Sequence, residues 1–105
     1  MKIVITGGTG FLGSNLAISL NALGHKVVIL DKKRTSLIKN FPKNIKIMYC
    51  DIVSEKSLKK IKLLNFDAVL HCAGQPSVEK SFEIPEKDLE INILGTFNII
   101  KWTKK

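Results

Sequence analysis

Short apolar runs recur along this chain, each followed by polar or glycine-rich residues. They predict four β-strands, at residues 3–5, 26–31, 45–50 and 66–71. The first, second and fourth runs are apolar at consecutive positions, which is typical of parallel strands buried on both faces. In the third run, Ile45, Ile47 and Tyr49 alternate with their neighbours, as in a strand with two different faces.

Segments with helical spacing lie between and after these runs. Leucines follow one another at intervals of four, four and three from residue 12 to residue 23, and predict a helix that ends at Gly24. Ser54 is expected to cap a short helix that buries Leu58 and Ile61 and exposes lysines. Residues 35–44 predict a polar connection with one helical turn at 36–40. Pro85 marks the first turn of the last helix. The apolar stripe of that helix consists of Leu89, Ile93, Phe97 and Ile100.

This alternation of strands and helices predicts an α/β fold built on a parallel sheet. Right-handed crossovers place the four strands in the order 3-2-1-4, which is a Rossmann-type arrangement. A chain of 105 residues is long enough for one domain with its own core. We therefore expect a single domain over residues 1–105.

A glycine-rich turn joins the first strand to the first helix. Gly7, Gly10 and Gly13 are spaced G-x-x-G-x-x-G, in the strand–turn–helix context that a dinucleotide-binding motif requires. Gly7 would turn the chain, Gly10 would let a pyrophosphate touch the backbone, and Gly13 would let the helix pack closely. Phe11 and Leu12, between the last two glycines, belong to the same expected site. The positive end of the helix would then hold the phosphates.

Asp31 ends the second strand, 24 residues after Gly7. A ribose-binding carboxylate belongs at about this distance in a dinucleotide fold, and it would repel a 2′-phosphate. Lys32 and the basic residues after it favour NADP instead, because a cation can accept that phosphate. We predict that Asp31 dominates and that the cofactor is NAD, with NADP less favoured.

The third and fourth strands also end in candidate residues. Asp51 follows the third strand, where it either contacts the cofactor or caps the next turn. The fourth strand runs into the small residues Cys72, Ala73 and Gly74, then Gln75, and small residues there allow backbone to lie against a dinucleotide. His71 is expected to be structural rather than catalytic.

Composition and charge exclude several functions. Hydrophobic residues make up 45% and charged residues 25% of the chain, as in soluble globular proteins. No apolar run approaches the ~20 residues of a membrane span, and we expect neither a membrane nor a secretory signal. The net charge is +8, and residues 1–62 hold 12 of the 17 basic residues. The only aromatic residues near these cations are Phe41 and Tyr49, apart from Phe11 in the glycine turn, and the basic residues are mostly lysines, as on a solvated surface. Nucleic acid is therefore not an expected partner.

The two cysteines, Cys50 and Cys72, form no C-x-x-C pair and no metal-ligand cluster. Isolated cysteines without a secretion signal predict free thiols in a cytoplasmic protein, and no metal site.

The sequence from Thr6 to Gly13, Thr-Gly-Gly-Thr-Gly-Phe-Leu-Gly, resembles the opening of the extended short-chain dehydrogenase/reductase family, the NAD-dependent epimerases and dehydratases. His71 to Gln75 resembles the family's His-x-Ala-Ala/Gly-Gln block, and Asn92 to Asn98 resembles its Asn-x-x-Gly-Thr helix. The resemblance implies the NAD(P)-binding Rossmann domain of this family, N-terminal part. It also implies that Asp51 and Ile52 hold the adenine and that Asn92 hydrogen-bonds near the cofactor. Between Ala68 and Ile100 the sequence most resembles the CDP-paratose (CDP-tyvelose) 2-epimerase branch.

The family's catalytic Tyr-x-x-x-Lys pair is absent from the sequence. Its one tyrosine, Tyr49, is followed four positions later by Val53. No catalytic residue is therefore assigned, and the chain alone is expected to be inactive. The leading hypothesis is the NAD-binding portion of a nucleotide-sugar epimerase or dehydratase, which would meet its sugar only with the missing part supplied. A stand-alone dinucleotide-binding module or partner subunit is the alternative. For the NAD-binding portion of a longer fold we expect self-association or a partner chain, whereas a monomer would favour the stand-alone module.

Overall fold

The computed structural model describes residues 1–32, 41–61, 65–74 and 83–104. The chain divides into two compact units, which are described separately. The sheet unit comprises Met1–Cys50 and Leu64–Ala73, and the helical unit comprises Asp51–Leu63 and Gly74–Lys105. The helical turn expected at 36–40 lies outside the described residues. No helix in the described parts of the chain is long and apolar enough to cross a membrane.

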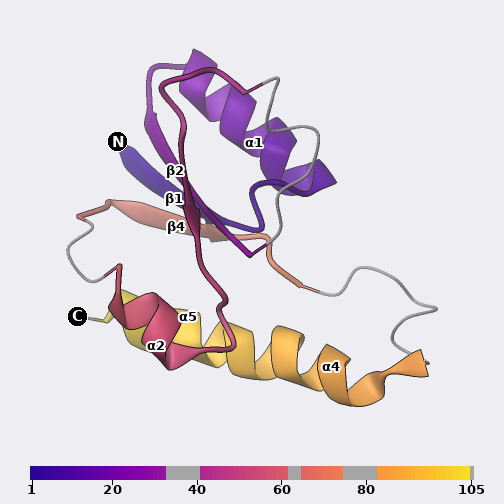
Figure 1. Ribbon diagram of the computed structural model, residues 1–105. Helices are drawn as coiled ribbons and strands as arrows, with labels where there is room; N and C mark the ends of the chain where they lie inside the picture. Colours follow the sequence, from indigo (N-terminus) through magenta and orange to yellow (C-terminus); the bar gives the residue numbers. More distant parts are fainter. Residues whose placement is uncertain (33–40, 62–64, 75–82, 105) are drawn as a thin grey trace. The chain divides into compact units, whose positions relative to one another are not determined.

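The sheet unit contains four parallel strands in the order β3-β2-β1-β4, as predicted. The strands are β1 (Lys2–Thr6), β2 (Lys26–Asp31), β3 (Lys46–Tyr49) and β4 (Ala68–His71). In this register Thr6 pairs with Leu30 on one side and with His71 on the other. The glycine turn after β1, Asp31 and the residues after His71 therefore emerge at the same edge of the sheet (Figure 1).

Helix α1 (Phe11–Ala22) lies beside the sheet in Figure 1 and contributes to its core. The core cluster consists of Ile3, Ile5, Ala17, Val27, Ile29, Phe41 and Ile45, with Leu16 and Leu20 packed against it. Of the four leucines whose spacing predicts this helix, the outer two, Leu12 and Leu23, are 61% and 74% exposed. The small residues Gly13 and Ala17 are buried instead, and Leu23 lies beyond the helix as its C-cap. Gly24 follows with φ +93°, the left-handed conformation predicted for it.

The outer strands are shorter than the sequence predicts. β3 ends at Tyr49, whose side chain is 65% exposed on the edge of the sheet, while the following Cys50 is buried. Before β4, the Asp67 carboxylate accepts a hydrogen bond from Lys2 N–H at 2.7 Å, and Asp67 N–H donates to Lys2 O at 2.8 Å. These contacts align the start of β4 with β1. Neither Cys50 nor Cys72 is part of a disulfide in the structure.

The helical unit pairs α2 (Glu55–Lys59) with α5 (Thr96–Thr103). Ser54 caps α2 as predicted, since its hydroxyl accepts a hydrogen bond from Ser57 N–H. Leu58 and Ile61 are buried, which confirms the predicted face.

The last helix is continuous in Figure 1, but it is not a uniform α-helix. α4 (Pro85–Leu89) leads into a π-helical segment, η2 (Glu90–Gly95), and then into α5. Pro85 lies in the first turn, as predicted. The buried residues of this helix are Gly95, Asn98, Ile99 and Trp102. The predicted apolar stripe is exposed, with 57% of Leu89, 62% of Ile93, 55% of Phe97 and 49% of Ile100 open to solvent.

Candidate functional site

The glycine turn leaves β1 through Gly7, whose φ of +68° lies in the left-handed region. Gly7 N–H donates to Leu30 O at 2.9 Å, and Gly10 N–H donates to Gly7 O at 3.1 Å. A Cβ atom on residue 7 would lie 2.7 Å from Ala73 N. Both the conformation and the space therefore require glycine, and the predicted role of Gly7 as the turning residue fits this geometry.

Gly13 brings α1 against this turn. A Cβ atom on residue 13 would overlap Gly7 O and lie 2.8 Å from Gly8 Cα. Gly10 differs, because the nearest atom to its Cβ position is Gly7 O at 3.4 Å, an ordinary contact. The turn is thus closely packed behind Gly10 and leaves room at Gly10 itself. A side chain there would fill the space that the sequence assigns to a pyrophosphate.

The first turn of α1 presents backbone donors without a side-chain cap. Its N-cap is Gly10, which has extended backbone and no side chain that could accept from the helix. Phe11 and Leu12 follow, and they are 86% and 61% exposed. An uncapped, accessible helix N-terminus carries partial positive charge and suits a phosphate group. The geometry is therefore compatible with the role predicted for these two residues.

Asp31 is held against the glycine turn. Its Oδ2 accepts hydrogen bonds from Thr9 N–H at 3.0 Å and from Thr9 Oγ1 at 2.6 Å. The carboxylate predicted to bind ribose therefore lies beside the turn predicted to bind pyrophosphate. Lys32 follows Asp31 with an exposed side chain. Lys33 and Arg34, the other cations weighed against Asp31, lie outside the described residues.

The end of β4 is tied to the end of β1. Thr6 is fully buried, its Oγ1 accepts from Ala73 N–H at 3.2 Å, and Oγ1 lies 2.7 Å from His71 Nδ1 in a second hydrogen bond. Burial lowers the pKa of His71 and favours its neutral form. Burial raises the pKa of Cys72, so that thiol is poorly suited to act as a nucleophile. These contacts support a structural role for His71, and they place Cys72 and Ala73 beside Gly7.

Asp51 and Ile52 belong to the helical unit. Asp51 Oδ1 accepts from Val53 N–H at 3.1 Å, and Asp51 N–H donates to Ser57 Oγ at 2.9 Å. Of the two roles left open for Asp51, the structure shows the turn-capping one, and adenine binding stays a prediction. Ile52 is buried and contacts the helix, since a Cβ atom on Gly95 would lie 2.6 Å from Ile52 Cδ1. Gly95 thus permits the helix to pack closely on Ile52.

Asn92 lies in the π-helical segment and is exposed. Its Nδ2 donates to Asp88 Oδ1 at 2.9 Å, and its backbone carbonyl accepts from Thr96 Oγ1 at 2.6 Å. Asn92 Oδ1 is 3.0 Å from the position of a Cβ on Gly74. Two residues of the predicted site, Gly74 and Asn92, are therefore brought together. Gln75 lies outside the described residues.

The structure adds residues that the sequence pattern did not single out. Thr9 lies between glycines, at a position where any small residue would serve as a spacer. The signal that could have identified it is its hydroxyl, in a turn that faces the acidic end of a strand. A Cβ on Gly8 would lie 2.6 Å from the Ile29 side chain, so this glycine also packs closely. Asn98 Nδ2 donates to Ile52 O at 2.9 Å and to Val53 O at 3.1 Å, which fixes the chain after Asp51.

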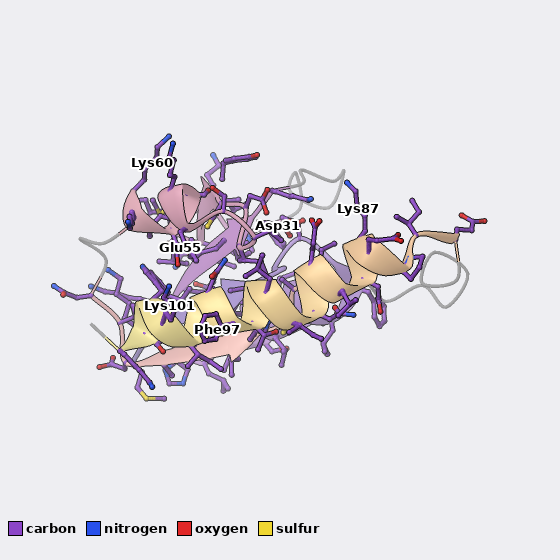
Figure 2. The ribbon with its side chains drawn as sticks, turned by 90° about the horizontal axis from the view of Figure 1, so that it is seen from below. Asp31, Glu55, Lys60, Lys87, Phe97 and Lys101 are labelled. Carbon is purple, nitrogen blue, oxygen red and sulfur yellow. The ribbon has the colours of Figure 1, made fainter. Side chains whose placement is uncertain are left out.

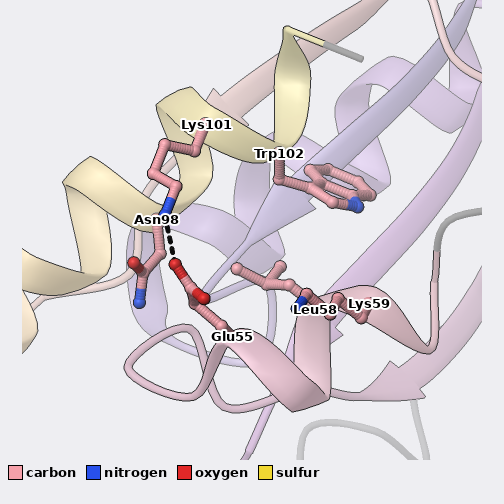
Figure 3. A pocket seen from close by; sticks show the side chains of 6 residues that line it. All are labelled: Glu55, Leu58, Lys59, Asn98, Lys101 and Trp102. Atoms are coloured by element: carbon pink, nitrogen blue, oxygen red, sulfur yellow. Dashed lines mark hydrogen bonds and ion pairs between the residues drawn. The ribbon is translucent and has the colours of Figure 1, made fainter.

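A small pocket of about 220 Å³ lies between α2 and α5 (Figure 3). It is lined by Glu55, Leu58, Lys59, Asn98, Lys101 and Trp102. Glu55 and Lys101 form an ion pair there, and Lys101 Nζ also lies 5.5 Å from the centre of the Phe97 ring (Figure 2). No residue of the predicted cofactor set lines this pocket.

Known proteins match this chain over nearly all of its length. The model of the NAD dependent epimerase/dehydratase family matches residues 3–105. A putative UDP-glucose 4-epimerase of Methanocaldococcus jannaschii is 35% identical over 103 residues, covering 98% of this chain and 34% of the relative. The UDP-glucose 4-epimerase of Neisseria meningitidis serogroup B is 38% identical over 103 residues, covering 90% of this chain and 30% of the relative.

A solved structure shows the same architecture. The crystal structure of UDP-glucose 4-epimerase from Thermus thermophilus in complex with NAD has a TM-score of 0.90 and 32% identity, covering 99% of this chain and 34% of that one. This chain thus spans about a third of the length of the proteins that it matches. Together with the parallel sheet and the glycine turn, the family match is decisive: the chain belongs to the NAD-dependent epimerase/dehydratase family.

Proposed function

We propose that this chain is the NAD-binding portion of a nucleotide-sugar epimerase. The observation that carries the proposal is the position of Asp31, whose carboxylate is hydrogen-bonded to the glycine turn from which α1 begins uncapped. A ribose-binding carboxylate and a phosphate-binding helix end are thus adjacent, as a dinucleotide requires. The backbone contacts of Gly7 and Gly13, where a Cβ would clash, keep that arrangement compact.

Each part of the sheet unit has a role in this proposal. The backbone N–H groups at the first turn of α1 bind the pyrophosphate, with Gly10 leaving room for it. Asp31 accepts hydrogen bonds from the adenosine ribose hydroxyls. The backbone at Cys72 and Ala73 lies against the dinucleotide, and Thr6 holds that backbone in place through Ala73 N–H. Bound NAD would supply hydride acceptance and donation at its nicotinamide.

The remaining candidates rest on the sequence resemblance. Asp51 and Ile52 stay assigned to the adenine, and Gly74, Gln75 and Asn92 stay assigned to the cofactor. The Lys32 side chain is exposed to solvent, where it can contact a phosphate of the cofactor. None of these residues is proposed to transfer a proton during the reaction, and the sequence contains no Tyr-x-x-x-Lys pair that could.

NAD is proposed over NADP because a 2′-phosphate would approach the Asp31 carboxylate. Two like charges brought together with partial desolvation disfavour binding by on the order of 1–3 kcal/mol. The carboxylate is also fixed by two hydrogen bonds, which limits its retreat. Isothermal titration of the chain with each cofactor tests this preference. Equal affinity for the two would show that the neighbouring cations decide.

For the substrate of the whole protein, we propose a UDP-hexose. The support is the set of similar proteins, which are named as UDP-glucose 4-epimerases. The sequence of residues 68–100 favours a second candidate, a CDP-paratose 2-epimerase type of substrate. Reading the coding DNA beyond the codon for Lys105 tests the enzymatic proposal, because a continuing frame should encode Tyr-x-x-x-Lys. An assay of that longer protein with UDP-glucose and CDP-paratose separates the two substrates.

A further inference from the structure

Thr9 lies in the glycine turn and is 1% exposed. Both of its donors reach the same carboxylate oxygen, Asp31 Oδ2, with the hydroxyl at 2.6 Å and the backbone N–H at 3.0 Å. Any residue but proline at position 9 would keep the backbone bond, but the shorter hydroxyl bond depends on threonine or serine. Hydrogen bonds to an ionised acceptor are among the stronger ones in proteins. The Thr9 hydroxyl therefore does much to fix the Asp31 side chain.

We propose that Thr9 is a positioning residue that sets cofactor preference through Asp31. Both of its bonds end on one oxygen, so together they fix the position of Asp31 Oδ2. A carboxylate held in this way is ordered before the ribose arrives, and less conformational entropy is lost on binding. The two hydrogen bonds also oppose rotation of the Asp31 carboxylate away from a 2′-phosphate. The inference rests on the proposed function, because it takes Asp31 to face the adenosine ribose.

Backbone hydrogen bonds hold the main chain next to Thr9 and at Asp31 in place. Gly7 N–H donates to Leu30 O at 2.9 Å, directly before Asp31, and Cys50 N–H donates to Asp31 O at 3.0 Å. Both ends of the Thr9–Asp31 contact are thus anchored to the sheet. Loss of the hydroxyl should leave the Asp31 backbone in place and weaken the restraint on its side chain, to which the residue 9 N–H still donates.

Titration of Thr9→Val with NAD and with NADP tests the proposal, because valine has the shape of threonine without the hydroxyl. We expect the Kd for NAD to rise about 3- to 10-fold, and the Kd for NADP to stay the same or fall. The preference for NAD should therefore shrink by about tenfold. Thr9→Ser keeps the donor and should restore most of the preference. An unchanged ratio of the two Kd values in Thr9→Val would overturn the inference.

A double-mutant cycle separates this role from a purely structural one. If Thr9 acts through Asp31, Thr9→Val should have no further effect on NAD binding in an Asp31→Ala background. An additive loss would overturn the inference. Circular dichroism checks that each variant is folded, and Thr9→Ala replaces Thr9→Val if valine prevents folding. A wild-type chain that binds neither cofactor would refute the proposed function and this inference with it. A wild-type chain that binds NAD through Asp31 regardless of Thr9 would refute this inference alone.

Discussion

Gly13→Ala should destabilise the sheet unit, although alanine is the better helix former. The new methyl group would overlap Gly7 O and lie 2.8 Å from Gly8 Cα, and both are backbone atoms of the turn. The turn cannot yield easily, because the Gly7 and Gly10 N–H groups are hydrogen-bonded within it and to β2. Overpacking of this kind typically costs roughly 1–3 kcal/mol, whereas replacing glycine by alanine inside a helix gains at most about 1 kcal/mol. Since residue 13 lies in the first turn, the gain is smaller, and we expect a net loss of about 1–2 kcal/mol.

Urea unfolding of the 105-residue chain, followed by circular dichroism, measures this loss. Gly10→Ser is the matched control, because the Cβ position of residue 10 meets Gly7 O at an ordinary 3.4 Å. Serine is also a favourable N-cap, so the free energy of unfolding should stay the same or rise. Its hydroxyl would nevertheless take the donors proposed for the pyrophosphate, and NAD binding should weaken. An unfolding midpoint of Gly13→Ala equal to that of the wild type would refute the close approach of α1 to the turn.

Further predictions concern pH, catalysis and association. Because burial lowers the pKa of His71, the unfolded chain binds a proton more readily than the folded chain does. The free energy of unfolding should therefore be greatest above about pH 6.5 and fall as the pH is lowered. In urea titrations, His71→Asn should reduce this pH dependence. The purified chain with NAD and UDP-glucose should show no turnover, and turnover that disappears in Gly7→Val would contradict this. The exposed stripe of Leu89, Ile93 and Phe97 should cause self-association, because the charge of +8 is screened beyond about 8 Å at physiological salt. Size-exclusion chromatography with light scattering should detect it, Ile93→Lys should lessen it, and a monodisperse 11.7 kDa wild-type monomer would count against it.

The sheet and the centre of the candidate site could be predicted because they depend on local signals. Consecutive apolar residues in β1 and β2 permit few alternatives to buried parallel strands, and right-handed crossovers then determine the strand order. Gly7 and Asp31 were found for a similar reason. A glycine directly after one strand and an acidic residue at the end of the next form a pair whose spacing is typical of a dinucleotide-binding fold.

The features that could not be predicted depend on packing between distant segments. The leucine spacing in α1 identified a helix, but the close contact of Gly13 with the turn determines which side is buried. The role of Thr9 depends on its hydrogen bonds to Asp31, 22 residues away, and the spacing of neighbouring residues does not predict that contact. The apolar spacing from Leu89 to Ile100 likewise does not predict the π-helical segment. Whether that stripe is covered depends on surfaces outside the helix itself.

A crystal structure of the chain grown with NAD is the most direct test of the central claim, that this unit binds the dinucleotide through the glycine turn and Asp31. We expect the pyrophosphate at the first turn of α1, beside Gly10, and an adenosine ribose hydroxyl within hydrogen-bonding distance of the Asp31 carboxylate. Thr9 should keep both of its bonds to Asp31 Oδ2 in that complex. Dinucleotide bound elsewhere, or bound with its ribose away from Asp31, would contradict the account.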